Sequence, residues 1–594
     1  MSSCAVALRF SCTRRAVRAA CATLAVVITS ACAGTPAPAT TAADAPVNGE
    51  SAVRREARLL SMVDQRQADT ALVDQLLMDP DPARRARTAL AIGQVRLRAR
   101  YPALRQLLVD GDTSIAANAA FAMGIAKDTG GVVALARAVA GAPTPVAREA
   151  AWALGEIGEP ARTVLAVALG DGQARPLTSS TTSQRAPEVR AALVLATVKL
   201  RPAPIALVTP WLADTSAEVV RAAAYVIGRL RAPAGARAAM AVRTHRDEEV
   251  RQHVARTLSK ATVGDSLGTP AREALRALVA DSSERVRINA ARSLATFGPT
   301  IADQVEPLLR DPAPNVRMAI AEVIGEAFAK DAARWQRAWD ADTALPVRRL
   351  LLGQARRLDV ALAPGVEGTW ATNEDWRYRV ASVATVDRES PAARRDTATA
   401  VTLLGDRDGR VQRAARARLG RRDSSETRAP RNTTPQPRPL AEYEALARRY
   451  VLSRTAPRAY IDTDHGTVTL ELFGREAPLV VEAFTRLAQN GTYRNTTFHR
   501  VVPNFVVQDG DASGDGSGES GFTLRESWTR QRHERGCLGL ATSGPDTGGS
   551  QYYLCHSTQP HLDGGYTVFG RVIDGFAAMD RIVQGDRMLR VRVP

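Results

Sequence analysis

The chain has 594 residues, which is too long for a single hydrophobic core, so two or more folding units are expected. Its net charge is +17, and only four of its 79 basic residues are lysines. The arginines alternate with acidic residues instead of clustering, which favours solvated helix faces over a nucleic-acid-binding surface. Aromatic residues make up only 5% of the chain and alanine dominates the first four hundred residues, a composition typical of closely packed helices.

A signal peptide is predicted over residues 1–31. Four arginines and no acidic residue precede an apolar run at 19–28, which is too short to span a bilayer but suits the core of a signal. The following TSAC sequence resembles the bacterial lipobox, and this resemblance predicts lipidation of Cys32. The alternative is an ordinary cleaved signal without lipid. Either interpretation predicts export, and lipidation would anchor the protein to a membrane of the bacterial cell envelope, facing the periplasm or the exterior.

The segment 32–60 is rich in proline, alanine and threonine and is predicted to be a flexible tether. Beyond it, Cys537 and Cys555 are the remaining cysteines, without a CxxC pair or a His/Cys cluster at zinc spacing. We therefore expect no metal and no cofactor. The two cysteines lie nine residues on either side of Asp546, so they could face each other across a strand pair. Whether they form a disulfide is left open.

An internal repeat occupies residues 61–421. An acidic residue, then Val-Arg, then small residues at helical spacing recur with gaps of 29 to 36 residues, and the recurring arginine stands at Arg190, Arg221, Arg251, Arg287, Arg317, Arg348 and Arg377. A period near thirty with two short amphipathic helices predicts an α-solenoid. The pattern resembles HEAT repeats, which implies a surface that binds an as yet unknown protein. Each Val-Arg is interpreted as a core valine followed by a solvated guanidinium, and the aspartate as an N-cap.

Two stretches interrupt this pattern. Residues 174–187 break the register and are predicted to be a loop insertion. Residues 422–455 begin with a charged, proline-rich run without periodicity, and are predicted to be a linker that contains a short helix.

The sequence pattern changes from helical repeats to alternating apolar and polar residues over residues 456–594. Alternating patterns predict strands at 459–463 and 467–473, joined by a turn at His465-Gly466, and a helix follows over 477–491. Short apolar segments then alternate with glycine-rich loops. This pattern predicts a closed antiparallel β-barrel after the α-solenoid.

Four blocks of this region resemble cyclophilins in sequence and in order: TFHRVVPNFVVQDGD, SGDGSGESGF, LATSGPDTGGSQYYLC and HLDGGYTVFGRV. The resemblance implies a peptidyl-prolyl cis/trans isomerase without a cofactor. It also implies that the substrates are proline-containing segments of exported or unfolded proteins.

The chemistry of this reaction fits the residues. Rotation about an Xaa-Pro bond faces a barrier of about 18–20 kcal/mol set by amide resonance, and a fixed guanidinium can donate to the nitrogen of the twisted amide. The resemblance implies that Arg500 is this catalytic residue. It implies substrate binding by Phe505, Val506, Gln508, Ala541, Thr542, Ser543, Gln551, Tyr553, His561, Leu562 and Tyr566. The sequence departs from the family at Val506, Thr542, Tyr553, His561 and Tyr566, where methionine, asparagine, phenylalanine, tryptophan and histidine are common.

Two further features of this domain suggest other functions, but each lacks the sequence context that the function needs. The GSGESG run at 516–521 fits a nucleotide-binding pattern but no helix start follows it. Ser550, His561 and Asp563 could form a hydrolase triad, but no nucleophile elbow surrounds Ser550. His499 is expected to be a buried structural histidine. The main alternative function is a non-catalytic envelope scaffold whose cyclophilin-like domain only docks proline peptides.

Overall fold

The computed structural model describes residues 50–170, 185–384, 393–420 and 437–594, except residue 519. The predicted signal peptide, Cys32, most of the tether, nearly all of the 174–187 insertion and the first part of the 422–455 linker lie outside these residues. The described residues belong to one compact unit that spans 46–594. Within them, no helix combines the length and the apolar character needed to cross a membrane.

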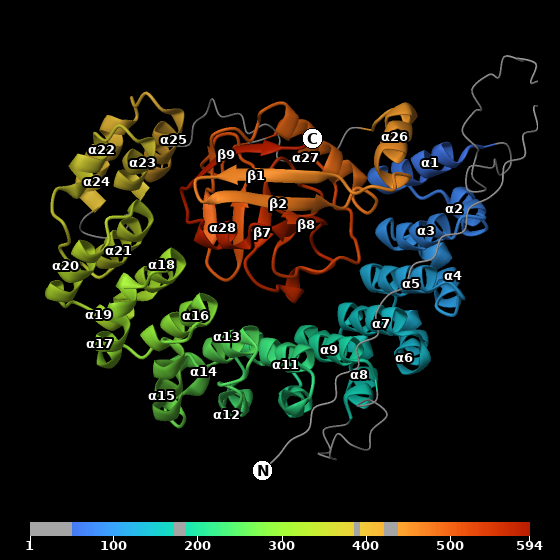
Figure 1. The fold of residues 1–594 in the computed structure, drawn as a ribbon, viewed down its shortest axis with the longest axis horizontal. Coiled ribbons are helices and arrows are strands. Elements are labelled where there is room, and N and C mark those ends of the chain that lie inside the picture. The colour runs from blue at the N-terminus through green and yellow to red at the C-terminus, as the bar shows by residue number, and fades with distance from the viewer. Residues whose placement is uncertain (1–49, 171–184, 385–392, 421–436, 519) are drawn as a thin grey trace, which may run out of the picture. The chain divides into compact units, whose positions relative to one another are not determined.

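Short helices in a regular series form the first part of the chain, which we call the arm (residues 50–420; Figure 1). Helices α3, α5, α7, α9, α11, α13, α16, α18 and α21 each pack against the next of this set, and the intervening helices line their outer side. The helices are α1 Ala52–Gln65, α2 Thr70–Leu77, α3 Pro82–Gln94, α4 Tyr101–Leu107, α5 Thr113–Ala126, α6 Val132–Gly141, α7 Thr144–Ile157, α8 Arg162–Leu169, α9 Pro187–Ala196, α10 Ile205–Val208, α11 Ala217–Leu230, α12 Pro233–Ala241, α13 Glu248–Thr257, α14 Lys260–Val263, α15 Gly268–Leu278, α16 Glu284–Ala295, α17 Ala302–Val305, α18 Pro314–Val323, α19 Gly325–Phe328, α20 Ala332–Ala341, α21 Leu345–Arg357, α22 Val366–Ala371, α23 Trp376–Ala384, α24 Ala393–Leu403 and α25 Gly409–Arg418.

Small residues set the spacing of these helices. A Cβ atom at Gly124 of α5 would lie 2.9 Å from Cα of Ala153 in α7, and one at Gly155 would lie 2.7 Å from Cα of Ala196 in α9. The helices therefore approach so closely that only glycine fits at these points. The alanine-rich composition is thus the consequence of a core built from closely stacked helices.

The repeated arginines bind the repeats to one another. Arg287 of α16 donates through Nε and Nη2 to Asp311, at 2.7 and 2.9 Å, and Asp311 in turn accepts the backbone N–H of Ala313. The same relationship joins Arg190 to Asp214, Arg221 to Asp247, Arg251 to Asp281, Arg317 to Asp342 and Arg379 to Asp406. Each pair links one repeat to the next, so the pairs form a ladder along the arm.

This ladder corrects two expectations. The arginines are not simply solvated: the exposed fraction of the side chain is 8% for Arg190 and 35% for Arg221, because each is paired with an aspartate of the following repeat. The last copy of the pattern is centred on Arg379, whereas Arg377 pairs with Asp375 in its own loop. The sequence WRYR contains two arginines two positions apart, and only the second one, Arg379, is positioned to pair with the aspartate of the next repeat.

Helix α1 begins at Ala52, so ordered helix occupies the last nine residues of the predicted tether. Ser51 caps it by accepting the N–H of Arg54. The helix predicted within the linker is α26, Leu440–Leu446, which packs against α1. There the buried Tyr443 donates its hydroxyl to Asp64 at 2.6 Å. The sequence of the predicted tether does not indicate this packing, because α26 lies far from α1 along the chain.

The C-terminal domain (residues 456–594) contains one antiparallel sheet of nine strands in the order β3-β9-β1-β2-β8-β6-β7-β5-β4. The predicted first two strands and the helix are confirmed as β1, β2 and α27. The elements are β1 Arg458–Thr463, β2 Gly466–Leu472, α27 Pro478–Gln489, β3 Thr496–Thr497, β4 Arg500–Val502, β5 Val506–Asp509, β6 Cys537–Leu540, β7 Tyr552–Cys555, β8 Val568–Asp574, α28 Phe576–Arg581 and β9 Arg587–Arg592.

The prediction of a closed barrel is wrong, because this sheet is a curled half-barrel with β3 and β4 at its two edges. Strand β3 pairs with β9 and strand β4 pairs with β5, and no ladder joins β3 to β4. The two edges of the sheet therefore stay open, whereas a closed barrel needs every strand to be paired on both sides. The helix α27 covers the core, which contains Phe484, Tyr493 and Tyr552.

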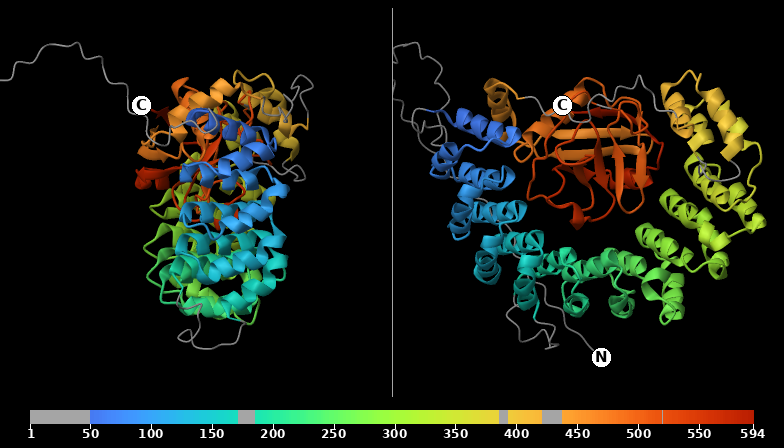
Figure 2. Two further views of the ribbon diagram at one scale, coloured as in Figure 1. Left: turned by 90° about the vertical axis from the view of Figure 1, so that its right-hand side faces the viewer. Right: turned by 180° about the vertical axis from the view of Figure 1, so that it is seen from behind.

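The C-terminal domain lies on the inner side of the arm, which curves round it from α1 to α25, as both face views show (Figures 1 and 2). Arm side chains donate to backbone carbonyls of the domain at several points along this surface. These are Gln94 to Trp528, Arg292 to Pro503, Asn315 to Asp580 and Arg377 to Gly585, at 2.6 to 3.0 Å.

Candidate active site

Arg500 is the first residue of the edge strand β4, and its side chain is exposed. It lies opposite Gln508 of β5, and its Nη1 donates to Oε1 of Gln508 at 3.2 Å. Gln508 then donates through Nε2 to Oε1 of Gln551 at 2.9 Å. The two amides hold the guanidinium in place, while the remaining N–H groups of Arg500 face solvent. Arg500 is therefore an oriented cation open to a ligand.

A cluster of apolar side chains lies beside this cation. Val506, Tyr553 and Leu562 form a buried cluster, and the partly buried residues packed against it include Phe505, Ala541 and Tyr566. The guanidinium carbon of Arg500 lies 5.6 Å from the centre of the Phe505 ring. The structure thus brings together the residues that the sequence predicts for a proline pocket.

The segment from Ala541 to Ser543 leaves the end of β6. The N–H of Ala541 donates to the carbonyl of Gln551 at 3.0 Å, and the N–H of Ser543 donates to the hydroxyl of Thr547 at 2.9 Å. Ser543 is exposed and Thr542 is half-buried. Since two of the three N–H groups are used inside the domain, the carbonyl groups are the more available partners for a bound chain.

His561 stands at the rim of the pocket. Its ring stacks on Phe505 with ring centres 5.9 Å apart and planes 22° apart. Its Nδ1 lies 3.1 Å from the hydroxyl of Tyr225, which belongs to α11 of the arm. Burial, followed by the nearby Arg229 and Arg256, lowers the pKa of His561 to about 4. The ring is therefore neutral at pH 7.

Comparisons with known proteins agree with this geometry. Residues 458–593 match the family model described as cyclophilin type peptidyl-prolyl cis-trans isomerase/CLD, and residues 70–155 and 271–350 match the model of HEAT repeats. A peptidyl-prolyl cis-trans isomerase of Helicobacter pylori is 41% identical over 152 residues, which are 25% of this chain and 91% of that protein. The chain belongs to the cyclophilin family.

Two further relatives match the same region. A peptidyl-prolyl cis-trans isomerase of Synechococcus elongatus is 39% identical over 138 residues, which are 23% of this chain and 95% of that protein. The peptidyl-prolyl cis-trans isomerase B of Bacillus subtilis is 42% identical over 132 residues, which are 22% of this chain and 92% of that protein. These identities support isomerase activity for the cyclophilin domain, and the arm consists of HEAT repeats.

The cyclophilin domain also contains a buried chain of polar groups that the sequence did not reveal. The hydroxyl of Tyr553 lies 2.9 Å from Nε2 of His533, and Nδ1 of His533 lies 2.9 Å from Oδ1 of Asp563. The same carboxylate oxygen accepts the backbone N–H of His533. His533 stands alone in RQRHERG, twenty residues from Tyr553 and thirty from Asp563, so no local pattern marks it.

The rival interpretations find no support in this geometry. His561 and Asp563 bind Tyr225 and His533, while the buried Ser550 contributes its carbonyl to the hydroxyl of Tyr493, so these residues do not form a triad. His499 is half-buried, and burial lowers its pKa. The ring packs against Gly516, and its buried Nδ1 has no hydrogen-bond partner among the described residues, so the expected buried and hydrogen-bonded histidine is only partly found.

The two cysteines lie side by side on β6 and β7 as free thiols, with their sulfur atoms 3.1 Å apart. Both are buried, and burial followed by the contact with Cys555 raises the pKa of Cys537 well above its usual range. The pair packs behind Val506 and Tyr553 in the pocket cluster. Its role in this structure is apolar packing.

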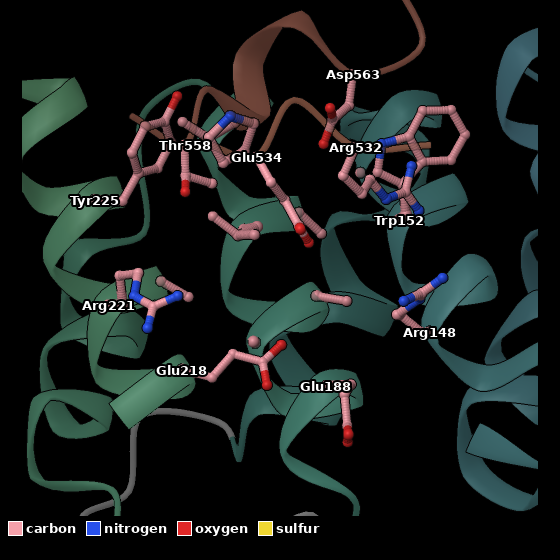
Figure 3. A pocket seen from close by; sticks show the side chains of 18 of the residues that line it. Arg148, Trp152, Glu188, Glu218, Arg221, Tyr225, Arg532, Glu534, Thr558 and Asp563 are labelled. Atoms are coloured by element: carbon pink, nitrogen blue, oxygen red, sulfur yellow. The ribbon is translucent and has the colours of Figure 1, made fainter. Parts of the chain in front are cut away.

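A pocket of about 640 Å³ lies where the arm meets the cyclophilin domain (Figure 3). Trp152 and Tyr225 of the arm and Arg532 and Asp563 of the domain are among its walls. It is separate from the proline pocket, since none of the predicted substrate-binding residues lines it. It does, however, border both neighbours of the 561–562 segment, through Pro560 and Asp563.

Proposed function

We propose that the cyclophilin domain isomerises Xaa-Pro bonds with Arg500 as its catalytic residue. The observation that carries this proposal is the position of the Arg500 guanidinium beside the apolar cluster predicted to form the proline pocket, with its carbon atom 5.6 Å from the centre of the Phe505 ring. A proline ring buried in this pocket places its amide near the cation. The apolar wall holds the ring while the chain on the other side of the bond rotates.

Catalysis here needs no nucleophile. The cis and trans forms differ by only about 0.5–1 kcal/mol, and the barrier between them is about 18–20 kcal/mol because rotation breaks amide resonance. In the twisted state the proline nitrogen regains its lone pair and becomes a hydrogen-bond acceptor. A guanidinium donor aimed at this nitrogen stabilises the twisted state more than either planar form, which lowers the barrier.

The amides of Gln508 and Gln551 orient this donor. Because Gln508 accepts from Arg500 and donates to Gln551, the guanidinium cannot swing freely on its long side chain. Such preorganisation removes the cost of ordering the donor in the twisted state. Arginine also stays charged throughout the physiological pH range, so the donor is always present.

We propose that the substrates are exported polypeptides and that Cys32 carries the lipid that anchors the enzyme to the cell envelope. The support is the charged and apolar N-terminal run that ends in TSAC at Cys32. Exchange of Cys32→Ser should move the protein from the membrane pellet into the soluble envelope fraction. An unmodified mature N-terminus at another residue, found by mass spectrometry, contradicts lipidation.

For the arm, we propose that it holds the cyclophilin domain and offers its outer surface to a protein partner. The support is the row of arm side chains that donate to backbone carbonyls of the domain. Contacts between side chains add to these, such as the ion pairs of Arg532 with Glu149 and of Arg66 with Asp546. The identity of an outer partner stays a prediction from the repeat architecture.

The enzyme and the scaffold make different predictions for one experiment. The purified full chain should accelerate cis/trans exchange of an Ala-Pro peptide, measured by exchange NMR, and should speed the proline-limited refolding of a reporter protein. A scaffold that only docks peptides would shift peptide resonances without raising the exchange rate. That second result would refute the proposed function.

A further inference from the structure

Tyr225 is the one tyrosine of the helix AEVVRAAAYVIGRL, where small residues dominate the surrounding turns. It is only 3% exposed, and its ring packs edge-on against the ring of His253 in α13, with centres 5.3 Å apart. Figure 3 shows Tyr225 on the arm side of the pocket, near Thr558 of the cyclophilin domain. A tyrosine held on both sides in this way presents its hydroxyl at a fixed point.

That point is the rim of the isomerase site, where the Tyr225 hydroxyl lies 3.1 Å from Nδ1 of His561. Burial raises the pKa of Tyr225 to about 12, against the opposing influence of Arg229 and the backbone N–H of His561. The phenol therefore keeps its proton at pH 7. Since the pKa of His561 is about 4, the two groups meet as a neutral phenol and a neutral imidazole.

Two arrangements of protons are compatible with this contact. Either Tyr225 donates to Nδ1 and the imidazole proton sits on Nε2, or Nδ1–H donates to the phenol oxygen. In the second arrangement the buried O–H of Tyr225 needs another acceptor, and among the described residues no hydrogen-bond acceptor for this hydroxyl other than Nδ1 of His561 is found. An unpaired buried donor is costly, so the first arrangement is favoured.

We propose that Tyr225 of the arm is a positioning residue for the isomerase: it fixes His561 as the Nε2–H tautomer, so that His561 donates a hydrogen bond to a carbonyl oxygen of the bound polypeptide. The stack on Phe505 holds the ring at the edge of the proline pocket. Nε2 lies on the side of the ring away from Tyr225, and within the described part of the chain it is neither buried nor hydrogen-bonded. It is thus open to a ligand. This inference rests on the proposed function of the site.

The inference gives the arm a part in substrate binding. The isomerase rim is complete only when α11 is in place, because the residue that orients His561 comes from the arm. Loss of one neutral hydrogen bond to the substrate corresponds to about a three- to tenfold loss of affinity. This loss of affinity should raise KM and leave kcat unchanged, because the rim contacts the substrate chain and not the bond that rotates.

The test uses the full chain with Tyr225→Phe, which removes the hydroxyl and keeps the buried ring. Ring-¹⁵N-labelled histidine allows the tautomer to be determined from long-range ¹H–¹⁵N couplings, and the seven histidines of the chain make assignment by His561→Gln practical. We expect Nε2–H in the native protein and a mixture of tautomers in Tyr225→Phe. KM for a proline peptide should rise about three- to tenfold in the variant, with kcat unchanged.

Tyr443→Phe is the matched control, because it removes a hydroxyl that is equally buried and bonded to Asp64 between α1 and α26. It should leave the His561 tautomer and KM unchanged. A second variant tests the mechanism. In a His561→Trp background the rim donor is an indole N–H, which has no tautomer, so adding Tyr225→Phe should then have no effect on KM.

Each outcome decides the inference. Nδ1–H in the native protein overturns it, as does an unchanged tautomer and KM in Tyr225→Phe. An equal rise of KM on Tyr225→Phe in both backgrounds would show that the hydroxyl acts only through packing, and this also overturns it. The tautomer is read without turnover, so its failure is distinguishable from the failure of the proposed function, which concerns acceleration of exchange.

Discussion

The hydroxyl of Tyr553 lies 2.9 Å from Nε2 of His533, so the apolar proline pocket carries a polar group on its buried side. Gly539 makes room for it, because a Cβ atom there would lie 2.4 Å from the Tyr553 oxygen. The other ring nitrogen of His533, Nδ1, is hydrogen-bonded to Asp563, which follows the pocket residue Leu562 in the sequence. The floor and the wall of the pocket are thus joined by buried hydrogen bonds as well as by packing.

This connection predicts unequal effects of two substitutions. Tyr553→Phe removes one hydroxyl and keeps the ring, so it should cost about 1 kcal/mol of stability. His533→Leu leaves the Tyr553 hydroxyl without a partner and leaves the buried Asp563 carboxylate with only the backbone N–H of residue 533, so it should cost more, about 2–3 kcal/mol. Urea unfolding followed by near-ultraviolet circular dichroism measures both. Equal midpoints for the two variants would show that Asp563 does not depend on His533.

The ladder of the arm predicts a second contrast. Asp311→Asn breaks the pair with Arg287, whose side chains are 14% and 6% exposed, and should destabilise the arm by about 1–3 kcal/mol. Asp74→Asn breaks the pair with Arg100, where Asp74 is 52% exposed, and should cost less than about 1 kcal/mol. Helical circular dichroism in urea measures the difference. If both substitutions shift the midpoint alike, the repeated arginines do not hold the repeats together.

The low pKa of His561 predicts that the isomerase activity does not change between pH 6 and 8. Burial, Arg229 and Arg256 all disfavour the imidazolium form of His561, whereas Asp563 opposes them, and the pKa is lowered to about 4. An NMR titration should therefore place the midpoint of His561 near 4, below the ordinary value of about 6.5. Turnover should be constant between pH 6 and 8 because Arg500 and His561 keep their protonation states there. A step in kcat/KM near pH 6.5 that follows the His561 resonance would refute this assignment.

The burial of Cys537 and Cys555 predicts that both thiols react slowly with alkylating reagents. Both thiols are buried, and burial raises the pKa of Cys537, whose thiolate is the reactive form. Both cysteines should therefore resist alkylation in the native protein, because a reagent cannot reach them. Protein purified without reductant should release two thiols on denaturation and almost none before it, measured with a chromogenic disulfide reagent. Fewer than two thiols after denaturation would indicate a bridge between Cys537 and Cys555.

Much of the fold was predictable because its patterns are local. Alternation in 459–463 and 467–473 and the amphipathic run that follows indicated two strands and a helix, and the structure contains them. The repeated Val-Arg motif indicated stacked helices. Closure of the sheet was not predictable in this way, since it depends on whether the two edge strands β3 and β4 pair with each other and on no residue pattern within either strand.

The site was predictable where its residues stand in the blocks shared with cyclophilins. Arg500, Gln508 and Gln551 are joined by hydrogen bonds, as a common site requires. The supporting residues Tyr225 and His533 were missed because each acts through a partner far away in sequence, 336 and 20 residues on. A lone tyrosine in an alanine-rich helix fits core packing equally well, so only the three-dimensional contact shows its relation to the rim.

The measurement that tests the central claim most directly is kcat/KM of the full chain for an Ala-Pro peptide with Arg500→Ala and Arg500→Lys. Arg500→Ala should lose about a hundredfold, which corresponds to about 2.7 kcal/mol of transition-state stabilisation. Arg500→Lys should lose nearly as much, because an ammonium group cannot keep the planar donor geometry that Gln508 and Phe505 orient. Rates equal to that of the native chain in both variants would contradict the account, since the proline pocket alone would then suffice for catalysis.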